Sequence, residues 1–289
     1  MKYAAIHKYI KQYPVSLMCR MLEVSRSGYY KWLSRGVGKR EAKRNKFEVL
    51  IKDTYEEFQA MYGARRIARE LNSLGFICSE NYVAQIMHEN QIRALNGKGF
   101  KYPQHSLSMT NVSENLLWRD FKASGPNKKW TSDITYVWVG SKWMYLAVVM
   151  DLFSRKIIGW AFGATMTEDL VIEALSVAFA RRGISNGENL IIHSDRGVQY
   201  RFQKYIDFAR SRGCELSMSR KGNCWDNAPM ESFFSRLKVE LIYRKNFQTP
   251  EEVRAGLFEY IEIFYNRKRR HSSIDYRSPV EYERMVLGA

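Results

Sequence analysis

Three acids in the 289-residue chain occupy places where a carboxylate could do chemistry. Asp133 lies within the alternating run SDITYVWVG, Asp195 ends the apolar run NLIIHSD, and Glu231 opens the run MESFFSRLKVELI. A carboxylate inside a central strand is costly unless it is paired or bound to a metal. Three such groups can hold two divalent cations that activate water and stabilise the leaving oxygen in phosphodiester displacement. Oxygen ligands of this kind favour Mg²⁺, with Mn²⁺ as a substitute.

Each acid has a plainer interpretation as well. Asp133 could lie at a surface edge, and Asp195, which precedes Arg196 and Gly197, could simply form a turn. A fourth acid, Asp226, comes just before Asn227 and a Pro, which is typical of a side chain that caps a helix with Pro in its first turn. We therefore expect Asp226 to cap the helix and Glu231, one turn inside it, to be the third metal ligand.

The elements that must position these acids belong to an α/β domain. SDITYVWVG, WMYLAVVMD and KIIGWAF are β-rich runs separated by tight breaks, which predicts an antiparallel meander. A helix is expected to follow from Thr167 to Gly183, and then a buried strand, a helix and a strand. Strand-helix-strand order implies parallel pairing, so the expected fold is a mixed five-stranded sheet with helices packed on it.

The first 36 residues predict a helix-turn-helix. Ser16 is expected to cap a first short helix and Ser25 a second one, RSGYYKWLSR. The second helix would present Arg26, Tyr29 and Lys31 to a DNA groove. A small packing subdomain has similar spacing, and that alternative remains open.

Residues 37–95 predict a connecting helix and a second helix pair, in which Gly75 ends one helix and Ser79 caps the next. Arg65, Arg66 and Arg69 would form one basic face, which is either solvated or in contact with phosphate. From residue 96 to 129 the periodicity is lost, which indicates a linker.

The net charge of +16 is unevenly distributed. Residues 1–129 hold 23 Lys and Arg against 11 Asp and Glu, a balance of +12, which suits a polyanionic partner. No apolar run approaches the roughly 20 residues that a bilayer-spanning helix needs, so no membrane is expected. The four cysteines form no C-x-x-C pair, and we expect a reducing, cytoplasmic location.

Several motifs together resemble the DDE transposases of bacterial insertion sequences, relatives of retroviral integrases. The motifs are WTSDITY, HSDRGVQY and DNAPMESFFSRLKVE, with 35 residues between Asp195 and Glu231, and YNRKRRHSSIDYRSP near the end. The chain is most similar to the copy-out, paste-in group, whose transposase is commonly split into two reading frames. It lacks visible coiled-coil heptads, and so resembles the second-frame product, with the first-frame product as a possible partner.

The resemblance implies an RNase-H-like core in which Asp133, Asp195 and Glu231 bind two Mg²⁺ ions. It implies hydrolysis at an element's end to free a 3′-OH, followed by attack of that hydroxyl on another phosphodiester. It also implies that Lys238 contacts terminal DNA, the alternative being a solvated helix lysine. Two ends must be held together, so we expect at least a dimer on double-stranded DNA, bound at terminal inverted repeats and at the target.

Further basic residues are candidates for DNA contact. Arg196, Arg220 and Lys221 lie in loops beside the acids, where positive charge would hold phosphates. The run NRKRRH, residues 266–271, would cap the preceding helix, follow DNA, or both. The expected domains are helix-turn-helix 1–36, connecting helix and second helix-turn-helix 37–95, linker 96–129, RNase-H-like core 130–245 and basic helical tail 246–289.

Two other functions compete with that of a transposase. One is a sequence-specific DNA-binding regulator with an inactive core, and the other is a simple RNase-H-like nuclease. The complete set of acids argues against the first, and the basic helix-turn-helix segments argue against the second.

Overall fold

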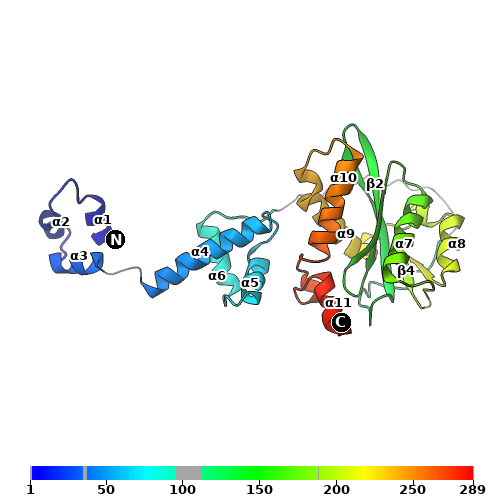
Figure 1. Ribbon diagram of the computed structural model, residues 1–289, viewed down its shortest axis with the longest axis horizontal. Coiled ribbons are helices and arrows are strands. Elements are labelled where there is room, and N and C mark those ends of the chain that lie inside the picture. The colour runs from blue at the N-terminus through cyan, green and yellow to red at the C-terminus, as the bar shows by residue number, and fades with distance from the viewer. Residues whose placement is uncertain (1, 35–37, 96–111, 188, 289) are drawn as a thin grey trace. The chain divides into compact units, whose positions relative to one another are not determined.

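The computed structural model describes residues 2–34, 38–95, 112–187 and 189–288 (Figure 1). The chain divides into two compact units, residues 1–93 and 94–289. The predicted linker lies partly outside the described residues, since 96–111 are not among them. Among the described helices, none combines the length and apolarity needed to cross a membrane.

Three short helices, α1 (Lys2–Lys8), α2 (Val15–Met21) and α3 (Arg26–Leu33), enclose a small core of Ile6, Cys19 and Tyr29. Ser25 caps α3 as predicted, since its hydroxyl accepts a hydrogen bond from the Gly28 amide at 3.0 Å. The predicted cap at Ser16 is wrong. The α2 helix already begins at Val15, directly after Pro14, whose fixed φ of −62° supplies the extended residue that precedes a helix.

The prediction that Tyr29 faces a groove is also wrong. Its side chain is fully buried between α1 and α2, and its hydroxyl lies 3.3 Å from His7 Nδ1. A tyrosine can serve as a core aromatic when its polar tip finds a partner. Arg26 and Lys31, from the same predicted set, are exposed.

A second group of helices comprises α4 (Lys39–Glu57), α5 (Ala64–Ser73) and α6 (Glu80–Glu89). Gly75 follows α5 with a φ of +85°, a left-handed conformation that favours glycine, and Ser79 caps α6 by accepting from the Tyr82 amide at 3.2 Å. Both helix-end predictions are confirmed.

The second unit is built on a five-stranded sheet with the order β3-β2-β1-β4-β5. The antiparallel meander has the bounds β1 (Lys129–Val139), β2 (Lys142–Asp151) and β3 (Ile157–Gly163). The parallel strands are β4 (Ile191–Ser194) and β5 (Glu215–Met218). The predicted mixed sheet is confirmed, and β1 lies at its centre.

Helices cover both faces of this sheet (Figure 1). On one face lie α7 (Glu168–Arg182) and α8 (Gln203–Ser211), which enclose a core with Trp130. On the other lie α9 (Ala228–Glu240), α10 (Pro250–Phe258) and a π-helix (Glu259–Tyr265), over a core with Val137. The chain continues to α11 (Pro279–Leu287). Successive side chains of β1 point to opposite faces of the sheet, so this strand contributes residues to both cores.

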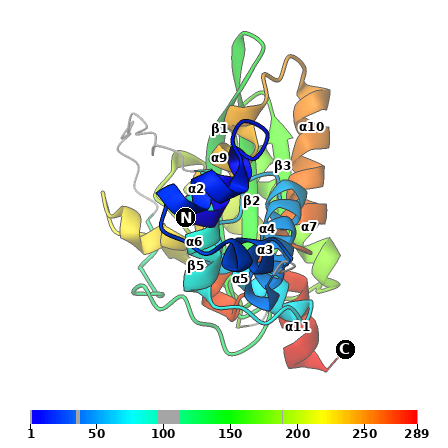
Figure 2. The same ribbon diagram turned by 90° about the vertical axis from the view of Figure 1, so that its left-hand side faces the viewer.

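Two close backbone approaches fix how these layers meet. A Cβ on Gly159 of β3 would lie 2.1 Å from the Ala174 carbonyl oxygen of α7, so only glycine fits there. The β1–β2 hairpin extends past the rest of the sheet beside the start of α10 (Figure 2), where the Gly140 amide donates to the Phe247 carbonyl at 2.9 Å.

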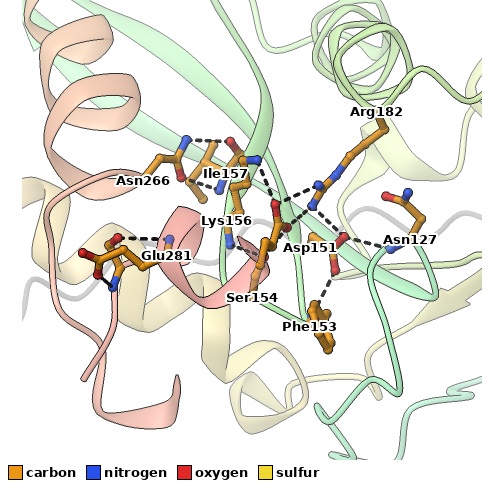
Figure 3. A network of polar contacts seen from close by, with 11 residues as sticks. Asn127, Asp151, Phe153, Ser154, Lys156, Ile157, Arg182, Asn266 and Glu281 are labelled. Carbon is orange, nitrogen blue, oxygen red and sulfur yellow. Dashed lines mark hydrogen bonds and ion pairs between the residues drawn. The ribbon is translucent and has the colours of Figure 1, made fainter. Parts of the chain in front are cut away.

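A buried polar network ties the end of β2 to α7 and α11. Asp151 is fully buried, and Arg182 Nη2 donates to it at 2.8 Å, as Figure 3 shows. Arg182 also donates to Glu283 of α11, which accepts from Lys156 and Ser154 as well. Asp151 therefore has a structural role.

This network predicts an acid-sensitive stability. Burial alone would raise the pKa of Glu283, but hydrogen bonds from Arg182, Lys156 and Ser154 lower it to about 2 from an ordinary value of 4.5. The resulting stabilisation is present above pH 4.5 and is lost as the pH falls toward 2. We expect Glu283→Gln to lower the free energy of unfolding by about 3 kcal/mol at pH 7.

Urea unfolding at pH 7 and pH 3 checks this prediction. The difference between wild type and Glu283→Gln should fall to less than half at pH 3, whereas Glu173→Gln, at an exposed site on α7, should show no such trend. A difference that is the same at both pH values would contradict it.

Candidate active site

Asp133 is held within the central strand by two hydrogen bonds to its carboxylate. Oδ1 accepts from the Ile134 amide at 2.7 Å, and Oδ2 accepts from Asn227 Nδ2 at 3.2 Å. Burial raises the pKa of Asp133 well above its usual range, and the negative charges of Asp195 and Glu231 raise it further. The carboxylate is therefore costly to ionise without a cation nearby.

Asp195 directly follows β4, the parallel neighbour of β1. Ser132 and Ser194 are register partners, and each acid comes one residue later, so the two carboxylates lie beside each other. Asp195 Oδ1 accepts from the Gly197 amide at 2.8 Å. Burial raises the pKa of Asp195, while the Gly197 hydrogen bond and the charge of Arg201 oppose that rise.

Glu231 lies in the first turn of α9, with an exposed side chain. Its charge acts on Asp133, so it belongs to the same electrostatic neighbourhood. Within the described residues, however, no three His, Cys, Asp or Glu side chains already converge closely enough to hold a metal ion. The structure thus pairs Asp133 with Asp195 and leaves Glu231 near them.

Asp226 does not cap α9, and that prediction is wrong. No side-chain cap forms at α9, and Asn227 occupies the N-cap position. The fully buried Asp226 carboxylate instead accepts from Arg220 Nε at 2.9 Å, from Arg119 Nε at 3.0 Å and from Asn115 Nδ2 at 2.9 Å. The hydrogen bonds of Arg220 are the main cause that lowers the pKa of Asp226 far below its usual range.

The loop arginines predicted to contact DNA have protein partners. Arg220 donates to Asp226 and lies over the exposed Trp118 ring, 5.2 Å from its centroid. Arg196 Nε donates to the Ser219 carbonyl at 2.7 Å. Lys221 is exposed. These contacts, which order the loop, could not be predicted from loop composition.

Lys238 is not the solvated helix lysine that the sequence left open as an alternative. Its side chain is buried, and this burial lowers the pKa of Lys238 to about 8. Lys238 follows Glu231 by seven residues, which is about two helical turns, so both residues lie on one side of α9.

In the first unit, the basic face of α5 is partly paired. Arg65 and Arg69 lie 3.6 and 3.5 Å from Glu80 of α6, and Arg66 lies over the Tyr62 ring at 5.6 Å. Arg65 and Arg69 remain exposed. Exposed pairs of this kind contribute little stability and leave the charge accessible.

Sequence reasoning missed several residues of the site. Asn227 contacts Asp133, Tyr200 bonds Ser132 at 3.0 Å behind it, and the buried Arg201 acts on Asp195. Asn227 lies in the motif DNAP and Tyr200 in the motif GVQY, but the spacing of these motifs does not indicate which residues they contact. His193 is a core histidine, 2.8 Å from Ser217 Oγ and 3.1 Å from Ser219 Oγ, and burial lowers its pKa to about 4.

Models of known protein families match three parts of the chain. Two family models described as "Integrase core domain" match residues 123–224 and 231–287, and a model described as "HTH-like domain" matches 42–99. Among solved structures, a simian T-cell lymphotropic virus intasome covers 75% of this chain and 70% of its own, with 19% identity and a TM-score of 0.46.

Full-length relatives are more informative. The transposase InsF for insertion sequence IS3A of Escherichia coli is 40% identical over 289 residues, which cover 99% of this chain and all of the relative. A 31 kDa protein of insertion element IS600 from Shigella sonnei is 38% identical over 265 residues, covering 92% of this chain and 97% of that protein. The sheet, the acids and these matches place the chain in the family of IS3-type insertion-sequence transposases, enzymes with an RNase-H-like integrase core.

Proposed function

We propose that Asp133, Asp195 and Glu231 are the metal ligands with which this transposase cleaves DNA at the ends of its element. The freed 3′-OH then attacks another phosphodiester, which joins the two strands and displaces the 3′-oxygen of the attacked strand. The observation that carries the proposal is the register of β1 and β4, which sets Asp133 beside Asp195. Burial raises the pKa of each acid, and the negative charge of Asp195 raises the pKa of Asp133 further.

The donor set fits a divalent cation. Two carboxylates forced together in a partly buried site are stabilised by a cation between them, and hard oxygen ligands favour Mg²⁺, or Mn²⁺ in its place. We propose two ions, which would supply an activated oxygen nucleophile and stabilise the leaving oxygen. The chain's own part is to hold the carboxylates in place with the Ile134, Gly197 and Asn227 donors.

Glu231 is proposed to complete the set by a local movement. It lies near the other acids without converging on them, and it follows the loop that contains Arg220, Lys221 and Gly222. We propose that Glu231 closes on the other acids when DNA binds beside the exposed Lys221, while Arg220 stays paired with Asp226, which ties the third ligand to the substrate. Protection of the loop from proteolysis should therefore change when terminal DNA is added, and unchanged protection would count against this step.

DNA contact is assigned to the basic residues that remain accessible. In the catalytic unit these are Arg196, Arg220 and Lys221 around the acids. The buried Lys238 is proposed as a further contact because it follows Glu231 by two turns on the same side of α9. In the first unit the accessible basic residues are Arg26, Lys31, Arg65, Arg66 and Arg69, together with the polar Ser25, within the proposed segments 1–36 and 37–95. The partners are terminal inverted repeats and target DNA, at the nucleoid, in a complex of at least two copies with the first-frame product as a further candidate.

The test is strand joining by the purified full chain on an oligonucleotide that matches the element's terminal repeat. We expect cleaved and joined products with Mg²⁺ or Mn²⁺ and none with a chelator. Products that form equally well with a chelator present would contradict a metal-dependent site. Binding without any cleavage under all metal conditions would instead favour an inactive regulator.

A further inference from the structure

Asn227 makes two directed contacts next to Asp133. Its side chain is buried, and its Oδ1 accepts a hydrogen bond from Thr131 Oγ1 at 2.6 Å, while its Nδ2 donates to Asp133 Oδ2 at 3.2 Å. The ionised Asp133 carboxylate can only accept, so the amide nitrogen must face it and the amide oxygen faces Thr131, whose hydroxyl donates to it. A flipped amide would turn its oxygen toward the carboxylate and lose the bond to Asp133.

The residue before Asn227 fixes its backbone. Asp226 accepts from the main chain and the guanidinium of Arg220, at 3.0 Å for the amide and 2.8 Å for Nη2. It also accepts from Asn115 and Arg119, which lie more than 100 residues earlier in the chain. A buried carboxylate with so many donors holds its segment firmly, because charge-assisted bonds are the strong ones.

We propose that Asn227 is a positioning residue for Asp133. Thr131 orients the Asn227 side chain and Asp226 anchors its backbone, so the two residues before α9 act together. With Ile134 on Oδ1 and Asn227 on Oδ2, the Asp133 carboxylate is held in one rotamer, and each oxygen keeps a lone pair for a cation. The proposal rests on the metal role proposed for Asp133.

Three variants of the full chain test this: Asn227→Ala, Thr131→Val and Thr131→Ser. Thr131→Val keeps the shape of the side chain but removes the donor, whereas Thr131→Ser keeps the donor. Loss of a partner that orients a metal ligand typically costs 10- to 100-fold in metal affinity or activity. We expect a loss of roughly that size in Asn227→Ala, about tenfold in Thr131→Val, and near wild-type behaviour in Thr131→Ser.

The readouts are Mn²⁺ affinity by calorimetry and the rate of strand joining. Thr135→Val is the matched control, since Thr135 is a buried threonine on the same face of β1 and should leave Mn²⁺ affinity unchanged. Wild-type Mn²⁺ affinity in both Asn227→Ala and Thr131→Val would overturn the proposal while leaving the proposed function intact. A wild-type chain that binds Mn²⁺ but does not join DNA would instead contradict the function, and the Thr131 pair would still decide the positioning role.

Discussion

Replacing Glu231 with Gln should lower the rate of strand joining at least about 1,000-fold, which corresponds to about 4 kcal/mol of lost transition-state stabilisation. Gln keeps the size and helix preference of Glu but removes the negative charge that a hard cation requires. Because Glu231 is exposed in the first turn of α9, the substitution leaves the core unchanged. The measurement is single-turnover joining of a labelled element end with Mg²⁺.

The matched control is Glu215→Gln. Glu215 is an exposed acid at the first residue of β5, on the same sheet as Asp195 but outside the proposed ligand set. It should join strands at the wild-type rate, and both variants should bind terminal DNA normally. Joining by Glu231→Gln within tenfold of wild type would remove Glu231 from the site.

The second large effect is on stability and concerns Glu240, at the end of α9. Glu240 is 4% exposed and Arg269 3% exposed, and Arg269 donates to Glu240 through Nη2 at 2.7 Å and Nε at 2.9 Å. The Tyr260 hydroxyl donates to the same carboxylate at 2.8 Å. Glu240→Ala should lower the free energy of unfolding by about 3–5 kcal/mol, because it leaves a buried guanidinium without its partner.

Denaturant unfolding followed by circular dichroism measures this effect. Arg267→Ala, which removes an exposed charge two residues before Arg269, should change stability by less than about 0.5 kcal/mol. If Glu240→Ala and Arg267→Ala had the same free energy of unfolding, the Glu240–Arg269 pair would contribute nothing to stability.

The contrast between Arg269 and its neighbours shows where sequence reasoning stops. The run NRKRRH predicted a basic helix end or a DNA-tracking segment, and composition gave no reason to separate one arginine from the rest. Arg269 turns into the core because Glu240, 29 positions earlier, lies opposite it. A partner so far away in the sequence leaves no local pattern.

Local patterns did predict what depends on local physics. The β-rich runs SDITYVWVG and WMYLAVVMD, separated by a tight break, predicted β1 and β2, and the strand-helix-strand order predicted the parallel pair. The cap at Ser25 depends on residues within one helical turn. The helical run MESFFSRLKVELI predicted the existence of α9 in the same way, although the role of Asp226 was not predicted correctly.

Asp226 and Tyr29 failed for one shared reason. Each has a side chain whose type suggests a local or exposed role, but each is buried against residues that the sequence spacing does not indicate. Asp226 accepts hydrogen bonds from Asn115 and Arg119 as well as from Arg220, and Tyr29 lies beside His7. The contact between Asn227 and Asp133 is also long-range in the sequence. For this reason the sequence could suggest the three acids but not the residue that orients the first of them.

The central claim is that the acids bind the catalytic metal directly, and a metal-preference switch at Asp195 tests it most directly. Asp195→Cys replaces a hard oxygen ligand with a soft thiolate, which disfavours Mg²⁺ and tolerates Mn²⁺ better. Joining rates of this variant and wild type are compared in Mg²⁺ and in Mn²⁺. We predict that Asp195→Cys is inactive with Mg²⁺ and recovers joining with Mn²⁺, whereas equal activity in the two metals would contradict direct ligation.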